Sequence, residues 1–189
     1  LALDADIFHA GGDPGDLIGI DMLGHAIGAV RDNRQWRTPG RRVREFRAMG
    51  WPAAPYFNAG VILVDCERFQ EERILPRTID FARDTPLARK VRDQGLVNCV
   101  LRGDWAELNP IWNWQYTWAS SWLVAATDPH LVHFIGPDKP WRDAAGEMPL
   151  RYTAAYDAFL GAHFPQAERV EVLKGPATAL YGSDAIGGV

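Results

Sequence analysis

Short apolar runs alternate along the chain with segments of helical spacing, and clusters of glycine, proline and charged residues separate them. Residues 61–64 are the clearest strand, because a continuous aliphatic run is typical of strands buried on both faces of a mixed or parallel sheet. Residues 151–164 place apolar side chains at helical spacing and predict an amphipathic helix. This alternation of strands and helices indicates a layered α/β domain.

The remaining elements follow from the same patterns. A strand is expected over residues 1–7, and the cluster HAGGDPGD after it is a loop. Further strands are predicted in three segments and helices in two: strands ending near residue 30, over 105–109 and over 130–136, and helices over 71–85 and 89–103.

The composition is that of an ordinary globular domain: of 189 residues, 47% are hydrophobic and 23% are charged. The net charge of -4 argues against general nucleic-acid binding. Cys66 and Cys99 have no metal-binding spacing, so a zinc site is not expected, and two buried thiols in a reducing compartment are. No apolar run is long enough to cross a bilayer.

Two compositional features each allow a purely structural interpretation and a functional one. The arginine-rich residues 31–50 are either a solvated surface or a patch that faces phosphates or a membrane. The tryptophans of NPIWNWQYTWASSW belong either to the core or to an aromatic wall that stacks on sugar rings, and the core is the simpler assignment.

Two carboxylates lie two positions apart in the opening segment LALDADIF. On an extended segment such residues share a face, so Asp4 and Asp6 are expected to point together toward the end of a strand, where open α/β sheets place their ligands. Carboxylates held close repel each other unless a cation neutralises them. Hard oxygen ligands favour Mg²⁺ or Mn²⁺, and an added imidazole would favour Mn²⁺.

Four motifs follow one another along the chain: LDADIF, YFNAGVILVD, DQGLVNCVL and LVHFIGPDKPW. In this order they resemble the family 8 glycosyltransferases, retaining enzymes of the GT-A fold that use nucleotide-sugar donors. The resemblance runs from the first residue to about residue 163. It implies a partial GT-A domain with a Rossmann-like mixed sheet and flanking helices.

The resemblance also implies roles for individual residues. Asp4, Asp6 and His133 match the Mn²⁺ ligands, with Mg²⁺ as the alternative ion, and the metal grips the diphosphate of the donor. Gly136 and Lys139 match the residues that contact the same phosphates, the glycine by close backbone approach and the lysine as a point charge. A divalent ion and a lysine would stabilise the negative charge of the leaving diphosphate.

Four further positions match residues around the donor sugar: Asn58 and its neighbour Ala59 in the FNAG motif, and Asp93 and Gln94 in DQG. Positive charge that develops on the sugar needs an electron-rich group nearby. The amide oxygen of Gln94 or the carboxylate of Asp93 could supply it, so these two are the catalytic candidates. Retention requires either a double displacement or a same-face attack by the acceptor hydroxyl, and both stay open.

Each candidate also has a structural interpretation. His133 could be a hydrogen-bonded core histidine, and Asn58 a turn residue that tolerates unusual backbone angles. Asp93 could cap a helix, with Gln94 on the surface. Lys139 could be an ordinary loop charge. The four other histidines show no partner pattern and are assigned structural or solvent-facing positions.

The chain departs from the family at both ends. Members have base-binding strands before the acidic pair, so residues 1–163 are expected to be the C-terminal portion of a GT-A domain, truncated at its N-terminus. The first strand would then expose apolar surface, and this chain alone would transfer sugar weakly or not at all. Residues 164–189 contain RVEVLKGPATALYGSDAIGGV and resemble the plug segment of TonB-dependent outer-membrane receptors. We interpret this segment as unrelated sequence at a junction, with a genuine fusion as the alternative.

The sequence therefore predicts a metal-dependent retaining glycosyltransferase that moves a hexose from a UDP-sugar to a saccharide or lipopolysaccharide-type glycolipid acceptor. UDP rests on the resemblance alone. The alternatives are a fragment of a TonB-dependent receptor and a carbohydrate-binding module without catalysis. The cysteines favour a cytoplasmic location, and the arginine-rich segment leaves peripheral contact with the inner membrane open.

Overall fold

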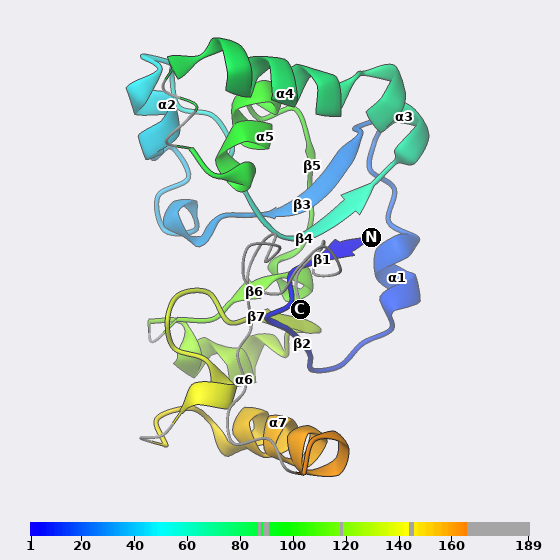
Figure 1. Ribbon diagram of the computed structural model, residues 1–189, viewed down its shortest axis with the longest axis vertical. Coiled ribbons are helices and arrows are strands. Elements are labelled where there is room, and N and C mark those ends of the chain that lie inside the picture. Colours follow the sequence, from blue (N-terminus) through cyan, green and yellow to red (C-terminus); the bar gives the residue numbers. More distant parts are fainter. Residues whose placement is uncertain (87, 89–90, 118, 144–145, 166–189) are drawn as a thin grey trace. The chain divides into compact units, whose positions relative to one another are not determined.

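The computed structural model describes residues 1–86, 88, 91–117, 119–143 and 146–165. They belong to two compact units, one of residues 1–133 and one that begins at residue 134 (Figure 1). The first unit holds every strand in the described part of the chain, together with the acidic pair and His133.

The first unit contains a four-stranded sheet of order β1-β4-β3-β5 and a three-stranded sheet of order β2-β7-β6. In the first sheet β3 pairs antiparallel with β4 and parallel with β5, so the sheet is mixed, as the aliphatic run predicts. In the second sheet β7 pairs antiparallel with β2 and parallel with β6. The strands are β1 (Ala2–Leu3), β2 (Ile7–His9), β3 (Ile27–Arg31), β4 (Phe57–Val64), β5 (Ala106–Glu107), β6 (Trp114–Gln115) and β7 (Leu131–His133).

Six α-helices are described in the first unit, and α4 and α5 lie side by side on one face of the four-stranded sheet (Figure 1). Aspartates before α1 and α3 accept hydrogen bonds from the first-turn N–H groups, which explains where these helices begin. The helices are α1 (Pro14–Ile18), α2 (Arg44–Ala48), α3 (Cys66–Glu71), α4 (Ile74–Asp84), α5 (Asp93–Leu101) and α6 (Val124–Thr127).

Strands β3 and β4 are buried on both faces. On one face Val30 and Val61 pack with Leu131 of the three-stranded sheet, so one core cluster joins the two sheets. On the other face Phe57 packs with Ile74 of α4 in a second cluster. The predicted strand over residues 61–64 is confirmed, and the structure extends it back to the FNAG motif.

The opening segment is not the single strand that its composition suggests. It forms β1 and β2, which belong to different sheets, and residues 5 and 6 make a turn between them. The acidic pair, Asp4 and Asp6, lies where the chain leaves the first sheet and enters the second. In the described part of the chain β1 pairs with β4 alone, and Leu1 and Leu3 are about half exposed.

The tryptophans of the NPIWNWQYTWASSW segment mostly serve the core. Trp112 and Trp114 are buried, and the ring of Trp114 lies 5.2 Å from that of Trp36. Trp122 is exposed, and Trp118 lies outside the described residues. The core assignment is therefore confirmed for the two tryptophans that flank Asn113.

The two cysteines differ in exposure. Cys66 begins α3 and is exposed, so the expectation of two buried thiols was wrong for this residue. The buried strand before it ends at Val64, and α3, which begins at Cys66, has no buried residue. Cys99 of α5 is buried, and burial raises the pKa of its thiol to about 11.

The second unit is built around α7 (Leu150–His163), the helix that apolar spacing predicts. Its first turns supply the apolar contact, since Tyr152 is fully buried and packs edge-to-face on the buried Phe134 at 5.1 Å. Phe159 further along remains 54% exposed, so the expected apolar face is only partly covered. Of the plug-like segment, residues 166–189 lie outside the described residues.

Candidate functional site

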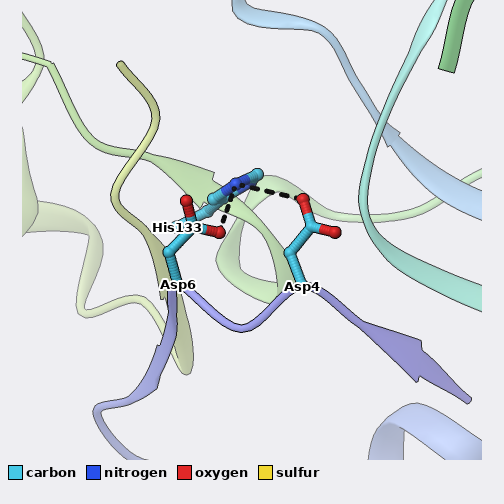
Figure 2. A group of neighbouring side chains, drawn as sticks. All are labelled: Asp4, Asp6 and His133. Atoms are coloured by element: carbon cyan, nitrogen blue, oxygen red, sulfur yellow. Dashed lines mark ion pairs between the residues drawn. The ribbon is translucent and has the colours of Figure 1, made fainter. Parts of the chain in front are cut away.

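Asp4 and Asp6 lie at a tight turn between the two sheets. The N–H of Ile7 donates to the carbonyl of Asp4 at 3.2 Å, and the N–H of Asp4 donates to the carbonyl of Gly60 in β4 at 2.9 Å. The two side chains thus point together because of a turn, not because they share the face of an extended strand (Figure 2). The expected convergence is present, but the geometric reason given for it was wrong.

His133 completes the cluster from the end of β7. In the pairing of β2 with β7 its partner is Ile7, which places the imidazole next to the turn. Its Nε2 lies 3.2 Å from Oδ1 of Asp6 and 3.6 Å from Oδ2 of Asp4 (Figure 2). Asp6 and His133 are buried, whereas the Asp4 side chain is about half exposed, so the cluster meets solvent on the side of Asp4.

These three side chains fit a divalent cation. One ligand atom from each lies within 4.8 Å of the others. Two carboxylates held this close repel each other in the absence of a cation, and an imidazole nitrogen beside them can complete a set of metal ligands. Carboxylate oxygens suit Mg²⁺ and Mn²⁺, and the imidazole tilts the preference toward Mn²⁺.

The second ring nitrogen of His133 faces away from the carboxylates. Its Nδ1 lies 3.0 Å from Oδ1 of Asn58 and 3.1 Å from Oδ1 of Asn113. A Cβ atom at Gly60 would lie 2.2 Å from Nδ1 and Cε1 of His133, so only glycine leaves room for the ring at this point of β4. The FNAG motif therefore supplies both a hydrogen-bond acceptor and the space for the imidazole.

Ala59 to Val61 form a bulge in β4, directly after Asn58. The register against β3 shifts there, because Ala29 pairs with Ile62 whereas Val30 pairs with Asn58. Bulges leave ladder groups unpaired and re-aim side chains. Here the N–H of Gly60 donates to the side chain of Asn58 at 2.9 Å, which satisfies one of these groups.

Gln94 satisfies the other bulge amide from the first turn of α5. Its Oε1 accepts from the N–H of Ala59 at 3.1 Å, and its Nε2 donates to Oδ2 of Asp32 at 3.1 Å. Asp32 also pairs with Arg34 at 2.7 Å, and this hydrogen bond raises the pKa of the Arg34 guanidinium. The amide oxygen that was assigned a role at the sugar is thus already an acceptor for the backbone.

The other candidate residues make contacts of their own. Asp93 is the first residue of α5, is exposed, and accepts a hydrogen bond from the N–H of Gln94 at 2.8 Å. Gly136 and Lys139 belong to the second unit, where Gly136 has a positive φ of 86° and Lys139 donates to the carbonyl of Phe134. The roles of these residues at a donor stay predictions.

Two polar residues near the site had no place in the sequence-based assignment. Asn113 and Gln115 are fully buried although they alternate with tryptophans in the segment that was interpreted as core. Gln115 accepts from the N–H of Asn33 and donates to the carbonyl of Arg31, so its role is to hold the backbone. The available signal was the alternation itself, because amides between buried aromatic residues need internal partners.

The chain matches the family profile described as Glycosyl transferase family 8 over residues 1–145, more than half of its length, and it belongs to this family. General stress protein A of Bacillus subtilis is 27% identical over 136 residues, which are 65% of this chain and 46% of that protein. The lipopolysaccharide 1,3-galactosyltransferase of Salmonella typhimurium is 28% identical over 150 residues, 75% of this chain and 43% of that protein. The chain thus spans less than half the length of these curated relatives.

A solved structure shows the same fold. The galactosyltransferase LgtC, crystallised with donor and acceptor sugar analogues, has a TM-score of 0.62 and 22% identity, and the match covers 82% of this chain and 59% of that one. The mixed α/β fold of the GT-A type, expected from the sequence, is confirmed.

A second family profile, TonB-dependent Receptor Plug Domain, matches residues 151–189. The resemblance of the tail is confirmed, and the match begins earlier than residue 164, within α7.

Among the described residues no helix has both the length and the apolar character that crossing a membrane requires.

The space at Gly60 gives the first testable prediction. A methyl group at this position would collide with the imidazole of His133, so Gly60→Ala is expected to lower the affinity for Mn²⁺ by about tenfold or more. The affinity is measured by electron paramagnetic resonance of free Mn²⁺. Gly40→Ala is the control, because nothing lies within 4 Å of a Cβ there. Equal Mn²⁺ affinity in the two variants would contradict the assignment.

Proposed function

We propose that the chain carries the metal-binding and sugar-binding part of a retaining glycosyltransferase, which moves a hexose from a UDP-sugar to a saccharide or glycolipid acceptor with the help of Mn²⁺ or Mg²⁺. The observation that supports this most directly is the convergence of Asp4, Asp6 and His133 in a member of family 8. The names of its relatives, among them lipopolysaccharide glucosyl- and galactosyltransferases, support a lipopolysaccharide-type acceptor.

The proposed roles follow from the chemistry of each group. A bound divalent ion would neutralise the diphosphate of the donor and so make it a better leaving group. Asp4 and Asp6 would hold that ion with the Nε2 of His133, and the exposed edge at Asp4 leaves the ion accessible to a donor. Lys139 and Gly136 would contact the same phosphates, the lysine through its charge.

The sugar would lie near the bulge of β4. We assign Asn58 and Ala59 to the donor site and Gln94 and Asp93 to the reacting sugar. Because Oε1 of Gln94 accepts from Ala59, its orientation is fixed before a sugar binds, and its remaining lone pair is the one available to a cationic sugar. Asp93 is exposed at the start of α5, next to Gln94.

Mn²⁺-dependent binding of UDP is the expected outcome for the purified 189-residue chain. Asp4→Ala and His133→Ala are each expected to abolish it, because they remove a proposed ligand. Isothermal titration with UDP, with and without Mn²⁺, measures the effect. Asp16→Ala is the control, since Asp16 is an exposed aspartate of α1 away from the cluster.

The result also separates the competing functions. Sugar binding that survives EDTA and both substitutions would favour a carbohydrate-binding module. Binding is a better measure than turnover here, because the chain spans less than half the length of its curated relatives. UDP binding that does not depend on Mn²⁺ would refute the proposed metal.

We further propose that the protein works at the cytoplasmic side of the inner membrane and touches it with the surface around α2. Five arginines there are exposed and have no ion pair among the described residues: Arg37, Arg41, Arg42, Arg44 and Arg47. Each arginine near an anionic surface contributes roughly 1 kcal/mol of attraction.

Replacing Arg41, Arg42 and Arg44 by Gln is therefore expected to weaken binding to vesicles of anionic phospholipid by at least ~10-fold. Co-sedimentation with such vesicles at low salt measures the change. Arg83→Gln is the control, because this arginine is exposed on α4 but paired with Asp80 and Asp84. If neutral vesicles bind the chain equally well, or the triple variant binds normally, the contact is not made by this surface.

We also propose that the glycosyltransferase part, residues 1–163, and the plug-like segment, residues 164–189, are sequences of separate origin joined near α7. A plug-like segment of this length is too short to fold alone, so no transport function follows from it. Sequencing of the genomic DNA across the codons for residues 145–170 is expected to show a break in the reading frame or in the assembly. One uninterrupted transcript across these codons would contradict an artificial junction and favour the alternative, a genuine fusion.

A further inference from the structure

The hydrogen bonds behind His133 determine more than its position. The carboxamides of Asn58 and Asn113 both direct an oxygen at Nδ1 of the imidazole, at 3.0 and 3.1 Å. We propose that these two asparagines are positioning residues that keep a proton on Nδ1, so that Nε2 is the nitrogen available to a metal held by Asp4 and Asp6. This inference rests on the metal site of the proposed function and adds the residues that prepare its nitrogen ligand.

The orientation of both amides can be derived from one backbone group. The N–H of Gly60 can only donate, and it lies 2.9 Å from the side chain of Asn58, so the atom of Asn58 that faces it must be the oxygen. The amide of Asn113 lies 2.9 Å from that same oxygen, so the atom it presents there must be its NH₂ group. The oxygen of Asn113 then has to face His133.

The proton on Nδ1 follows from these orientations. Both atoms that face Nδ1 are carbonyl-type oxygens, which accept hydrogen bonds and cannot donate them. A bare Nδ1 lone pair would be repelled by both oxygens, whereas a protonated Nδ1 donates to them. Fixing the proton on one ring nitrogen leaves the other as the ligand atom.

Burial of both asparagines stabilises these hydrogen bonds. Asn113 is fully buried and Asn58 is 7% exposed, so water cannot readily replace either partner. An unpaired buried amide is costly, which ties the two side chains to each other and to the ring. Gly60 closes the remaining side, since its bare Cα lies against the imidazole.

The consequence for a metal lies at Nε2. This atom is 3.2 Å from Asp6 and 3.6 Å from Asp4, on the opposite side of the ring from the asparagines. Groups that hydrogen-bond the far nitrogen of a ligand histidine fix the ring orientation and its tautomer, and their loss typically lowers metal affinity about 10–100-fold. Asn113, 20 residues before His133, would therefore influence metal affinity without touching the metal.

The first test locates the proton directly in the metal-free chain. Long-range ¹H–¹⁵N correlation spectra of histidine-labelled protein distinguish a protonated from a bare ring nitrogen, and the signals of His133 are identified by their loss in His133→Ala. We expect a proton on Nδ1 of His133. A bare Nδ1 with the proton on Nε2 alone would overturn the inference.

The second test measures Mn²⁺ affinity in variants of Asn113. Asn113→Leu keeps the volume but removes the acceptor, and it is expected to lower the affinity by about tenfold. Asn113→Asp restores an acceptor for Nδ1 and is expected to stay closer to the wild-type affinity than the leucine variant. Asn109→Leu is the matched control, because Asn109 is an exposed asparagine of the same segment whose side chain accepts from the N–H of Ile111.

The outcomes separate this inference from the proposed function. An Asn113→Leu variant that folds, judged by circular dichroism, and binds Mn²⁺ as tightly as the Asn109→Leu control would overturn the inference and leave the metal site intact. A wild-type chain that binds no Mn²⁺ would overturn the proposed function, while the proton position on His133 still decides the positioning role. If Asn113→Leu fails to fold, the proton position in the wild-type spectrum still decides the inference.

Discussion

The site depends on the interruption of the ladder between β3 and β4, where Ala29 pairs with Ile62 and the next residue pairs with Asn58. A regular ladder would have used the N–H groups of this stretch for strand pairing. The bulge instead leaves them to side-chain amides from α5 and from Asn58 itself. Because the Asn58 side chain is fixed by the N–H of Gly60, it holds an oxygen at Nδ1 of His133, and the carbonyl of Gly60 holds Asp4 of the acidic turn.

Much of the fold could be predicted because its signals are local. The aliphatic run of β4 and the spacing of α7 are readable from neighbouring residues, and both elements were placed correctly. The segment before residue 10 was misjudged because its strand composition does not reveal that two sheets divide it. Cys66 was misjudged for a similar reason, since exposure after a buried strand depends on where the next helix leaves the core.

Some residues of the candidate site could also be predicted from the sequence, and others could not. Asp4, Asp6 and His133 could be proposed from motif order, although 127 positions separate the last two, because the family resemblance supplied their association. The contact of Asn113 with Asn58, 55 positions away, has no such signal, since it arises only when β6 and β7 come to lie beside the bulge. A residue such as Asn113, which orients a candidate metal ligand, is found only from tertiary contacts. The candidate metal ligands themselves can be proposed from residue type and motif order.

The turn at Asp4 and Asp6 joins two sheets, and this has a mechanical consequence. Asp4 is anchored to the four-stranded sheet through the carbonyl of Gly60, whereas Asp6 and His133 stand at the junction of β2 and β7 in the other sheet. An ion coordinated by all three would cross-link the sheets without any covalent bond. Occupancy of the site by such an ion would then raise the free energy needed to shear one sheet past the other, so ion binding would also stabilise the fold.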